Sequence, residues 1–211
     1  MNKAVSGLYA VTPDLTDTIA LAGKVDAALR GGARVIQYRS KSTERALRRV
    51  QAAEIACLCR TWNALFIVND SVELAREVGA DGVHLGKDDA DVGVARAMLG
   101  GEKLIGVSCY NEIERARAAV SRGADYVAFG SFFPSATKPL ALRAGTELLR
   151  IAASEFALPV VAIGGINEDN AAELIAAGAD AVAVVSALFD APDIEAQARR
   201  IARLFEIPVH S

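Results

Sequence analysis

Eight short runs of β-branched and other apolar residues alternate along the chain with longer segments of helical periodicity. This alternation is typical of βα units and of a parallel sheet that is buried on both faces. The runs are Gly7–Val11, Arg34–Tyr38, Leu65–Val68, Gly82–Leu85, Leu104–Val107, Tyr126–Gly130, Val160–Ile163 and Ala181–Val185, and a helical pattern follows each of them. A chain of 211 residues lies at the short end of the range that an eight-stranded α/β barrel needs. We therefore predict a single (β/α)8 TIM barrel that forms one domain over residues 1–211.

A Gly-Ala pair precedes every second run, which amounts to an internal repeat of two βα units. The pairs are Gly32-Ala33, Gly79-Ala80, Gly123-Ala124 and Gly178-Ala179. Glycine is favoured just after the end of a helix, so each pair marks the boundary between a helix and the next strand. The repeat suits a barrel whose interior layers draw side chains from alternate strands. The competing architecture is an open doubly wound sheet, which would usually lack so regular a repeat.

Composition and charge restrict the classes of function. The 52% hydrophobic content supplies a large core without disulfides, and Cys57 and Cys59 do not have the spacing of a metal or redox pair. The net charge of -3 argues against nucleic acid as a partner. No apolar run approaches the roughly 18 residues of a membrane span, and the first residues lack a signal-type stretch. We expect a cytoplasmic protein without a membrane partner, and the sequence leaves its oligomeric state open, homo-oligomers included.

Polar residues follow the second strand, and in a barrel the loops after the strands carry the chemistry. The segment reads Gln37-Tyr38-Arg39-Ser40-Lys41. Alternation along an extended backbone sends Gln37, Arg39 and Lys41 to the same side. Arginine offers a planar fork and lysine a point charge, so this cluster is suited to a phosphate or diphosphate. The alternative interpretation is a solvated strand end.

Carboxylates follow the third and fourth strands. Asn69 and Asp70 end the third strand, and Asp88 and Asp89 lie in the loop after the fourth. Helix capping by Asn69 or Asp70 is the alternative interpretation. Carboxylates from neighbouring loops that face a basic cluster fit Mg²⁺, which typically takes one or two carboxylates plus phosphate and water oxygens. The sequence therefore predicts a Mg²⁺ site at this rim.

The fifth strand ends in Ser108 and Cys109, which offer a hydroxyl and a thiol at the mouth of the barrel. A nucleophilic cysteine needs an activating base, and among the equivalent strand ends only His84 offers one. We interpret His84 as a packed, hydrogen-bonded residue between two apolar neighbours. Covalent catalysis is therefore disfavoured.

The last three loops add further anion-binding groups. The loop after the sixth strand, residues 131–139, is the longest and brings Lys138 toward the mouth, although it could be a solvated surface loop. The seventh strand ends in Gly164-Gly165, and the eighth is followed by Ser186. Loops after these two strands often bind phosphate through backbone N–H groups, and paired glycines let the backbone approach the anion.

Taken together, these segments resemble thiamine phosphate synthase, from Leu8 to Ser186. The motifs that carry the resemblance are Gln37-Tyr38-Arg39-Ser40-Lys41, Asn69-Asp70, Gly82-Val83-His84-Leu85-Gly86 with Asp89, Gly106-Val107-Ser108, Pro134 with Thr137-Lys138, and Gly164-Gly165. The resemblance implies that 4-amino-2-methyl-5-(diphosphooxymethyl)pyrimidine is joined to 4-methyl-5-(2-phosphooxyethyl)thiazole. The implied products are thiamine phosphate and diphosphate, formed by a dissociative, Mg²⁺-assisted substitution.

The resemblance also implies roles for individual residues. The pyrimidine diphosphate would be bound by Gln37, Tyr38, Arg39, Ser40, Lys41, Asn69, Ser108 and Lys138. Asp70 and Asp89 would hold Mg²⁺. The thiazole phosphate would be surrounded by Ser135, Ala136, Thr137, Gly165, Val185 and Ser186. The expected catalytic groups are Arg39, Lys41, Lys138 and Ser108.

Three positions depart from the family's pattern, namely Lys87, Tyr110 and Phe129 with Ser131-Phe132, and they concern the detail of the pocket. Two other functions stay open. A thiazole tautomerase-like paralogue would share the phosphate cradle but would need neither diphosphate nor Mg²⁺. A non-catalytic barrel that binds a phosphorylated ligand would be stabilised by that ligand without turnover.

Overall fold

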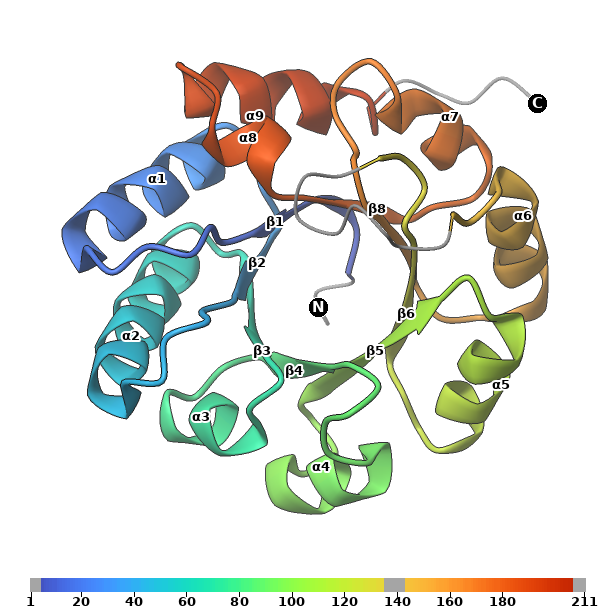
Figure 1. Cartoon of the computed structure of the whole chain (residues 1–211), viewed down its shortest axis with the longest axis horizontal. Helices are drawn as coiled ribbons and strands as arrows, with labels where there is room; N and C mark the ends of the chain where they lie inside the picture. The colour runs from blue at the N-terminus through green and yellow to red at the C-terminus, as the bar shows by residue number, and fades with distance from the viewer. Residues whose placement is uncertain (1–4, 135–142, 207–211) are drawn as a thin grey trace.

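The computed structural model describes residues 5–134 and 143–206, and its parallel strands close into a barrel in the order β1 to β8. The strands are β1 (Gly7–Val11), β2 (Val35–Tyr38), β3 (Leu65–Asn69), β4 (Gly82–Leu85), β5 (Leu104–Tyr110), β6 (Tyr126–Phe129), β7 (Val160–Ile163) and β8 (Ala181–Val184). Figure 1 looks down this barrel and shows the strands as a ring inside a ring of helices. The predicted (β/α)8 barrel is confirmed, and the open doubly wound sheet is excluded.

The helices follow the strands in the expected order. They are α1 (Thr18–Arg30), α2 (Arg45–Thr61), α3 (Val72–Glu77), α4 (Val92–Leu99), α5 (Ile113–Ser121), α6 (Thr146–Glu155), α7 (Ala171–Ala176), α8 (Ser186–Phe189) and α9 (Ile194–Arg203). Two helices follow β8, where the sequence predicted one, because a new helix begins after Asp193, whose side chain accepts from the backbone N–H of Ala196. Within the described ranges, no helix combines the length and the hydropathy that crossing a bilayer requires.

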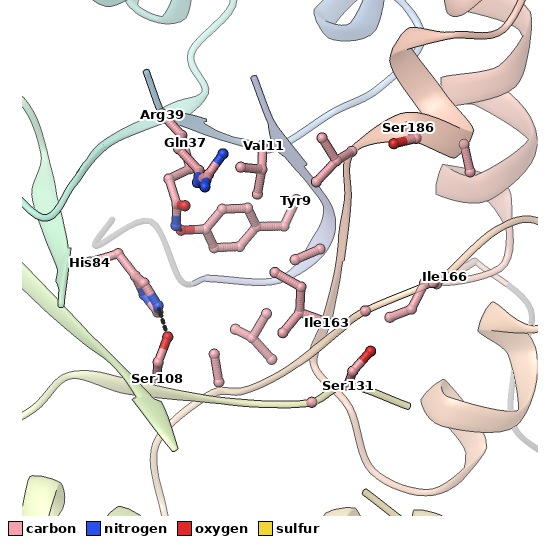
Figure 2. Close-up of a pocket in the computed structure, with 18 of the residues that line it drawn as sticks. Tyr9, Val11, Gln37, Arg39, His84, Ser108, Ser131, Ile163, Ile166 and Ser186 are labelled. Atoms are coloured by element: carbon pink, nitrogen blue, oxygen red, sulfur yellow. Dashed lines mark hydrogen bonds between the residues drawn. The ribbon is translucent and has the colours of Figure 1, made fainter. Parts of the chain in front are cut away.

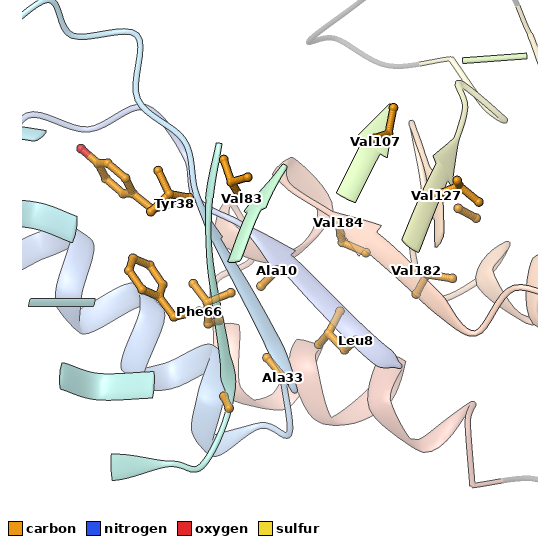
Figure 3. Packing of buried hydrophobic residues seen from close by; sticks show 14 of the residues in the cluster. Leu8, Ala10, Ala33, Tyr38, Phe66, Val83, Val107, Val127, Val182 and Val184 are labelled. Atoms are coloured by element: carbon orange, nitrogen blue, oxygen red, sulfur yellow. The ribbon is translucent and has the colours of Figure 1, made fainter. Parts of the chain in front are cut away.

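Apolar side chains on the two faces of the strands form two separate cores. On the outer face, side chains such as Leu8, Phe66 and Val182 pack against the helices (Figure 3). On the inner face, Tyr9 and Tyr126 lie among smaller apolar residues in the interior of the barrel. Alternation of side chains along each strand produces this division. As a result, the inward side chains near the strand ends are the ones that reach the mouth.

The two-unit repeat has a structural basis at the amino ends of the strands. An aspartate follows three of the four Gly-Ala pairs, and its carboxylate accepts a hydrogen bond from a backbone N–H of the preceding strand. These bonds join Asp81 to Phe66 at 2.8 Å, Asp125 to Ile105 at 2.7 Å and Asp180 to Val160 at 2.8 Å. They connect β3 to β4, β5 to β6 and β7 to β8. After the first pair, the corresponding residue is Arg34.

Candidate active site

A cavity of about 340 Å³ opens at the carboxyl ends of the strands. Every strand contributes to its wall, either directly or through the loop that follows it (Figure 2). The lining residues include Tyr9, Val11, Gln37, Arg39, Asn69, His84, Ser108, Tyr110, Ser131, Pro134, Ile163, Gly164, Gly165, Val185 and Ser186. The sequence analysis predicted the functional residues at this end of the barrel.

Arg39 provides the positive charge that the described part of the chain brings to this cavity wall. Its backbone is held from the neighbouring strand by Thr12, a buried residue that follows β1. The Thr12 hydroxyl donates to the carbonyl oxygen of Arg39 at 3.0 Å and accepts from the N–H of Arg39 at 2.8 Å. A residue whose main chain is fixed on both sides loses little further freedom when its guanidinium binds an anion.

Asp70 and Asp89 lie side by side on the same rim. The backbone N–H of Asp70 donates to the carbonyl oxygen of His84 at 2.8 Å, with Asp70 in a left-handed conformation (φ 64°). Asp89 accepts from the N–H of Gly86 at 2.6 Å, and a Cβ on Gly86 would lie only 2.9 Å from that carboxylate oxygen. The close turn at Gly86 therefore fixes one carboxylate, and an unusual backbone conformation aims the other.

The two carboxylates interact electrostatically. The pKa of Asp70 is raised to about 6, first by partial burial and then by the hydrogen bond and the charge of Asp89, against the opposing charges of Arg39 and Arg48. Within residues 5–134 and 143–206, no cluster of three or more His, Cys, Asp or Glu side chains could hold a metal ion. Two carboxylates alone form an incomplete ligand shell, which suits Mg²⁺ because this ion completes its shell with phosphate and water oxygens.

Five polar side chains form one line of hydrogen bonds across the interior, here called the interior line. The Gln37 amide nitrogen donates to the Tyr9 hydroxyl at 2.7 Å, and the hydroxyls of Tyr9 and Tyr126 are 2.9 Å apart. The Tyr126 hydroxyl lies 3.0 Å from Nδ1 of His84, and Nε2 of His84 lies 2.8 Å from Oγ of Ser108. Figure 2 shows the last of these bonds and the Gln37 amide next to the Tyr9 ring.

The opposite wall, after β6, β7 and β8, carries no charged side chain among the described residues that line the cavity. Gly164 (φ 104°) and Gly165 (φ 66°) adopt conformations that L side chains rarely adopt. A Cβ on Gly164 would lie 2.1 Å from Oγ of Ser131, and one on Gly165 would lie 2.4 Å from the carbonyl oxygen of Pro134. Only glycine allows two loops to approach so closely. Val185 and Ser186 line the same wall.

The structure brings together much of the predicted site. Gln37, Arg39, Asn69, Ser108, Gly165, Val185 and Ser186 line one cavity. Asp70 and Asp89 are not among its lining residues, but they contact each other, with Asp70 directly after Asn69 and Asp89 in the loop that follows His84. The predicted residues Ser135, Ala136, Thr137 and Lys138 lie outside the described residues.

Three other residues of the second-strand motif are placed differently. The Tyr38 side chain lies on the outer face of β2, where its hydroxyl donates to Oε1 of Gln51 in α2 (Figure 3). The Lys41 side chain is exposed, and its backbone N–H donates to Asp14 at 3.0 Å. The Ser40 hydroxyl oxygen accepts from the N–H of Ser42. Neither Tyr38, Ser40 nor Lys41 lines the cavity.

The sequence analysis missed Tyr9 and Tyr126 and gave His84 no more than a packing role. An available signal was strand alternation, which places Tyr9 on the same face as Val11 and so inside the barrel. Cys109, by contrast, is fully buried on the outer face, where burial raises the pKa of its thiol to about 12. A thiol in this environment stays protonated and makes a poor nucleophile.

Comparison with known proteins gives one consistent result. Residues 8–188 match the sequence profile of the family described as thiamine monophosphate synthase. Thiamine-phosphate synthase of Thiobacillus denitrificans is 56% identical over 205 residues, covering 97% of each chain. The corresponding protein of Nitrosospira multiformis is 54% identical over 204 residues, covering 97% of this chain and 87% of the relative.

A solved structure agrees with these relatives. Thiamine phosphate pyrophosphorylase from Pyrococcus furiosus superposes with a TM-score of 0.86 at 37% identity, covering 97% of this chain and 96% of that one. A 3-hexulose-6-phosphate synthase superposes with a TM-score of 0.69 at 17% identity, which reflects the barrel fold alone. Because the family profile and the relatives both span nearly the whole chain, including the cavity wall described above, this chain belongs to the thiamine monophosphate synthase family.

Proposed function

We propose that this single-domain barrel is a Mg²⁺-dependent thiamine phosphate synthase. It would join 4-amino-2-methyl-5-(diphosphooxymethyl)pyrimidine to 4-methyl-5-(2-phosphooxyethyl)thiazole and release diphosphate. The observation that carries the proposal is the Asp70–Asp89 pair beside Arg39, at the rim of a cavity whose other wall is a neutral glycine turn. The names of the relatives support the same activity.

The charged wall is the place for the diphosphate. Arg39 would bind its oxygens through charge-assisted hydrogen bonds, and the two carboxylates would hold Mg²⁺ against it. Bound Mg²⁺ would supply positive charge that stabilises the leaving diphosphate. Lys138 and Lys41 remain proposed contributors from the adjoining loops.

The neutral wall is the place for the monophosphate of the thiazole. Gly165, Val185 and Ser186 would surround it with main-chain groups and one hydroxyl, and Ser135, Ala136 and Thr137 remain proposed partners. Backbone N–H groups can bind a small anion such as the thiazole monophosphate without a charged side chain on this wall. The two walls would thus hold the reactants with their reacting carbon and nitrogen between them.

The chemistry would need no enzyme base or nucleophile. The bond between the pyrimidine methylene and the diphosphate oxygen breaks, and the oxygen keeps the electron pair. The lone pair of the thiazole nitrogen then forms the new C–N bond. The chain's own contribution is to stabilise the departing negative charge through Arg39 and to align the two substrates.

A coupled assay of diphosphate release tests this proposal. We expect release only when both substrates and Mg²⁺ are present, and loss of release after chelation. Isomerisation of a thiazole phosphate without the pyrimidine would favour the tautomerase-like alternative. Thermal stabilisation by the thiazole phosphate without any release would favour the non-catalytic binding barrel.

A further inference from the structure

The interior line has a direction, because a hydroxyl carries a single hydrogen. The Gln37 amide donates to the Tyr9 oxygen, and the buried Tyr9 hydrogen still needs an acceptor, which the Tyr126 oxygen offers at 2.9 Å. The Tyr126 hydrogen then points to Nδ1 of His84. A neutral imidazole whose Nδ1 accepts a hydrogen bond carries its own hydrogen on Nε2, and this hydrogen points to Oγ of Ser108. The Ser108 hydrogen is thereby left for the cavity.

The packing around the line keeps it in place. Tyr9 and Tyr126 are fully buried, and burial raises the pKa of both phenols, so their hydroxyls stay protonated. The Tyr126 ring lies directly over Gly106 of β5, where a Cβ would come within 1.9 Å of the ring. The same ring stacks on His84 with 5.6 Å between centroids. The glycine at position 106 is therefore what admits the phenol between His84 and Tyr9.

We propose that Tyr9, Tyr126 and His84 are positioning residues that turn the Ser108 hydroxyl into a hydrogen-bond donor toward the substrate. The acceptor would be an atom of the pyrimidine diphosphate, so this inference rests on the proposed function. Ser108 without the line could either donate or accept, because its hydroxyl rotates freely. With the line, the Ser108 hydrogen is free for the ligand and one of the two lone pairs is used by His84, which favours an acceptor atom on the ligand over a donor.

The opposite direction of the line is a complete alternative. If the Gln37 amide oxygen accepted from Tyr9, every hydrogen would reverse, and His84 would carry its hydrogen on Nδ1. Ser108 would then donate to His84 and would present only lone pairs to the cavity. The tautomer of His84 therefore reports which group Ser108 offers.

Nitrogen-15 NMR of the histidine side chains reads that tautomer directly. The chain has two histidines, so one further variant, His210→Gln, assigns the signals. At a pH of about 8, above the ordinary histidine pKa of about 6.5, we expect the Nε2–H tautomer for His84. A Nδ1–H tautomer, an averaged signal or a doubly protonated ring would each overturn the proposal.

Gln37→Glu tests the control of direction. A carboxylate can only accept, so Tyr9 would have to donate to it, and we expect the His84 signal to switch to the Nδ1–H tautomer. Tyr38→Phe is the matched control, because it removes another buried phenol hydroxyl, one that bonds to Gln51 on the outer face. The control is expected to leave the His84 signals unchanged. An unchanged tautomer in Gln37→Glu would contradict the proposal.

A double-mutant cycle tests the link to catalysis. We expect Ser108→Ala to lower kcat/KM by roughly 10- to 100-fold and Tyr126→Phe by roughly 3- to 10-fold, mainly through the KM of the pyrimidine diphosphate. Tyr126→Phe keeps the ring over Gly106 and so preserves the packing. In the Ser108→Ala background it should cost nothing further, and effects that multiply would refute the proposed coupling.

The proposed function and this inference fail separately. If the wild-type chain releases no diphosphate, the proposed function is wrong, whereas the NMR result still decides the direction of the interior line. If the chain is active and His84 has the Nδ1–H tautomer, the inference is wrong and the proposed function stands.

Discussion

The two walls of the cavity would bind anions by different physical means. On the side of β2 to β4, Arg39, Asp70 and Asp89 are ionisable side chains, and the charge of Asp89 disfavours ionisation of Asp70. On the side of β7 and β8, Gly164 and Gly165 use main-chain shape and carry no charge. The charged wall depends on side-chain chemistry and on pH, whereas the neutral wall depends on the absence of a Cβ. Substitutions on the two walls should therefore affect different substrates.

Asp70→Asn is expected to have the largest effect. Asparagine keeps the shape and tolerates the left-handed backbone of position 70, so the fold is preserved while one proposed Mg²⁺ ligand becomes neutral. We expect kcat/KM to fall by at least about 100-fold. Diphosphate release measured against Mg²⁺ concentration checks this. Asp88→Asn removes an exposed carboxylate from the same loop and should stay within about twofold of wild type.

Arg39→Gln should weaken binding at the charged wall and leave binding at the neutral wall unchanged. We expect the KM of the pyrimidine diphosphate to rise by roughly 30-fold and the KM of the thiazole phosphate to stay unchanged. Only the diphosphate would lose its hydrogen bonds to the planar guanidinium of Arg39. Arg45→Gln removes an exposed arginine that pairs with Glu77 on the outside, and serves as the control. Equal changes in both KM values would contradict the division of the cavity into two walls.

Gly165→Ala should have the reverse selectivity. The added Cβ would collide with the loop at Pro134, so we expect the KM of the thiazole phosphate to rise by about tenfold. Gly123→Ala also places alanine at positive φ (90°) but in open space, and it separates backbone strain from crowding at the mouth. Gly123→Ala should lose about 1 kcal/mol of stability in thermal unfolding, and Gly165→Ala should lose more because its Cβ also collides with backbone. Only Gly165→Ala should lose affinity.

The smallest expected effect concerns stability and pH. The folded-state pKa of Asp70, about 6, lies above its ordinary value of 3.8, so between these two values the folded state binds more protons than the unfolded state. The free energy of unfolding of the metal-free protein should therefore fall as the pH rises through this window. Mg²⁺ should restore part of the loss. The Tm of Asp70→Asn should depend less on pH than that of the wild type. Parallel curves of Tm against pH for the two proteins would show that Asp70 does not contribute to the pH dependence of stability.

The fold was largely predictable, because eight apolar runs and four Gly-Ala pairs define the units without tertiary information. The details that escaped depend on contacts between units. β5 continues to Tyr110 because it pairs with β6 beyond Ser108, with a shift in register at that point. Such an extension needs the partner strand, and the sequence of Leu104–Val107 alone does not encode it.

The site was predictable where alternation applies and unpredictable where it ends. Gln37 and Arg39 line the cavity as expected, but β2 ends at Tyr38, and the alternation that placed Lys41 on the same side does not extend that far. Tyr126 was missed because its hydroxyl meets that of Tyr9, 117 residues away. In the sequence, a tyrosine inside an apolar run cannot be distinguished from a hydrophobic core residue, because the hydrogen-bond partner of its hydroxyl is not known.

The hydrogen bonds from aspartate side chains at the amino ends of the strands also bear on local opening of the barrel. Three neighbouring pairs of strands are tied there by a carboxylate, whereas between β1 and β2 the corresponding residue is Arg34. Leu8, whose carbonyl oxygen accepts from the N–H of Arg34, is the equivalent of Phe66, Ile105 and Val160, and we expect its amide hydrogen to exchange with solvent sooner than theirs. The strand that leads to Arg39 would then open first at its amino end, while the bonds from Thr12 keep its carboxyl end and the diphosphate wall in place.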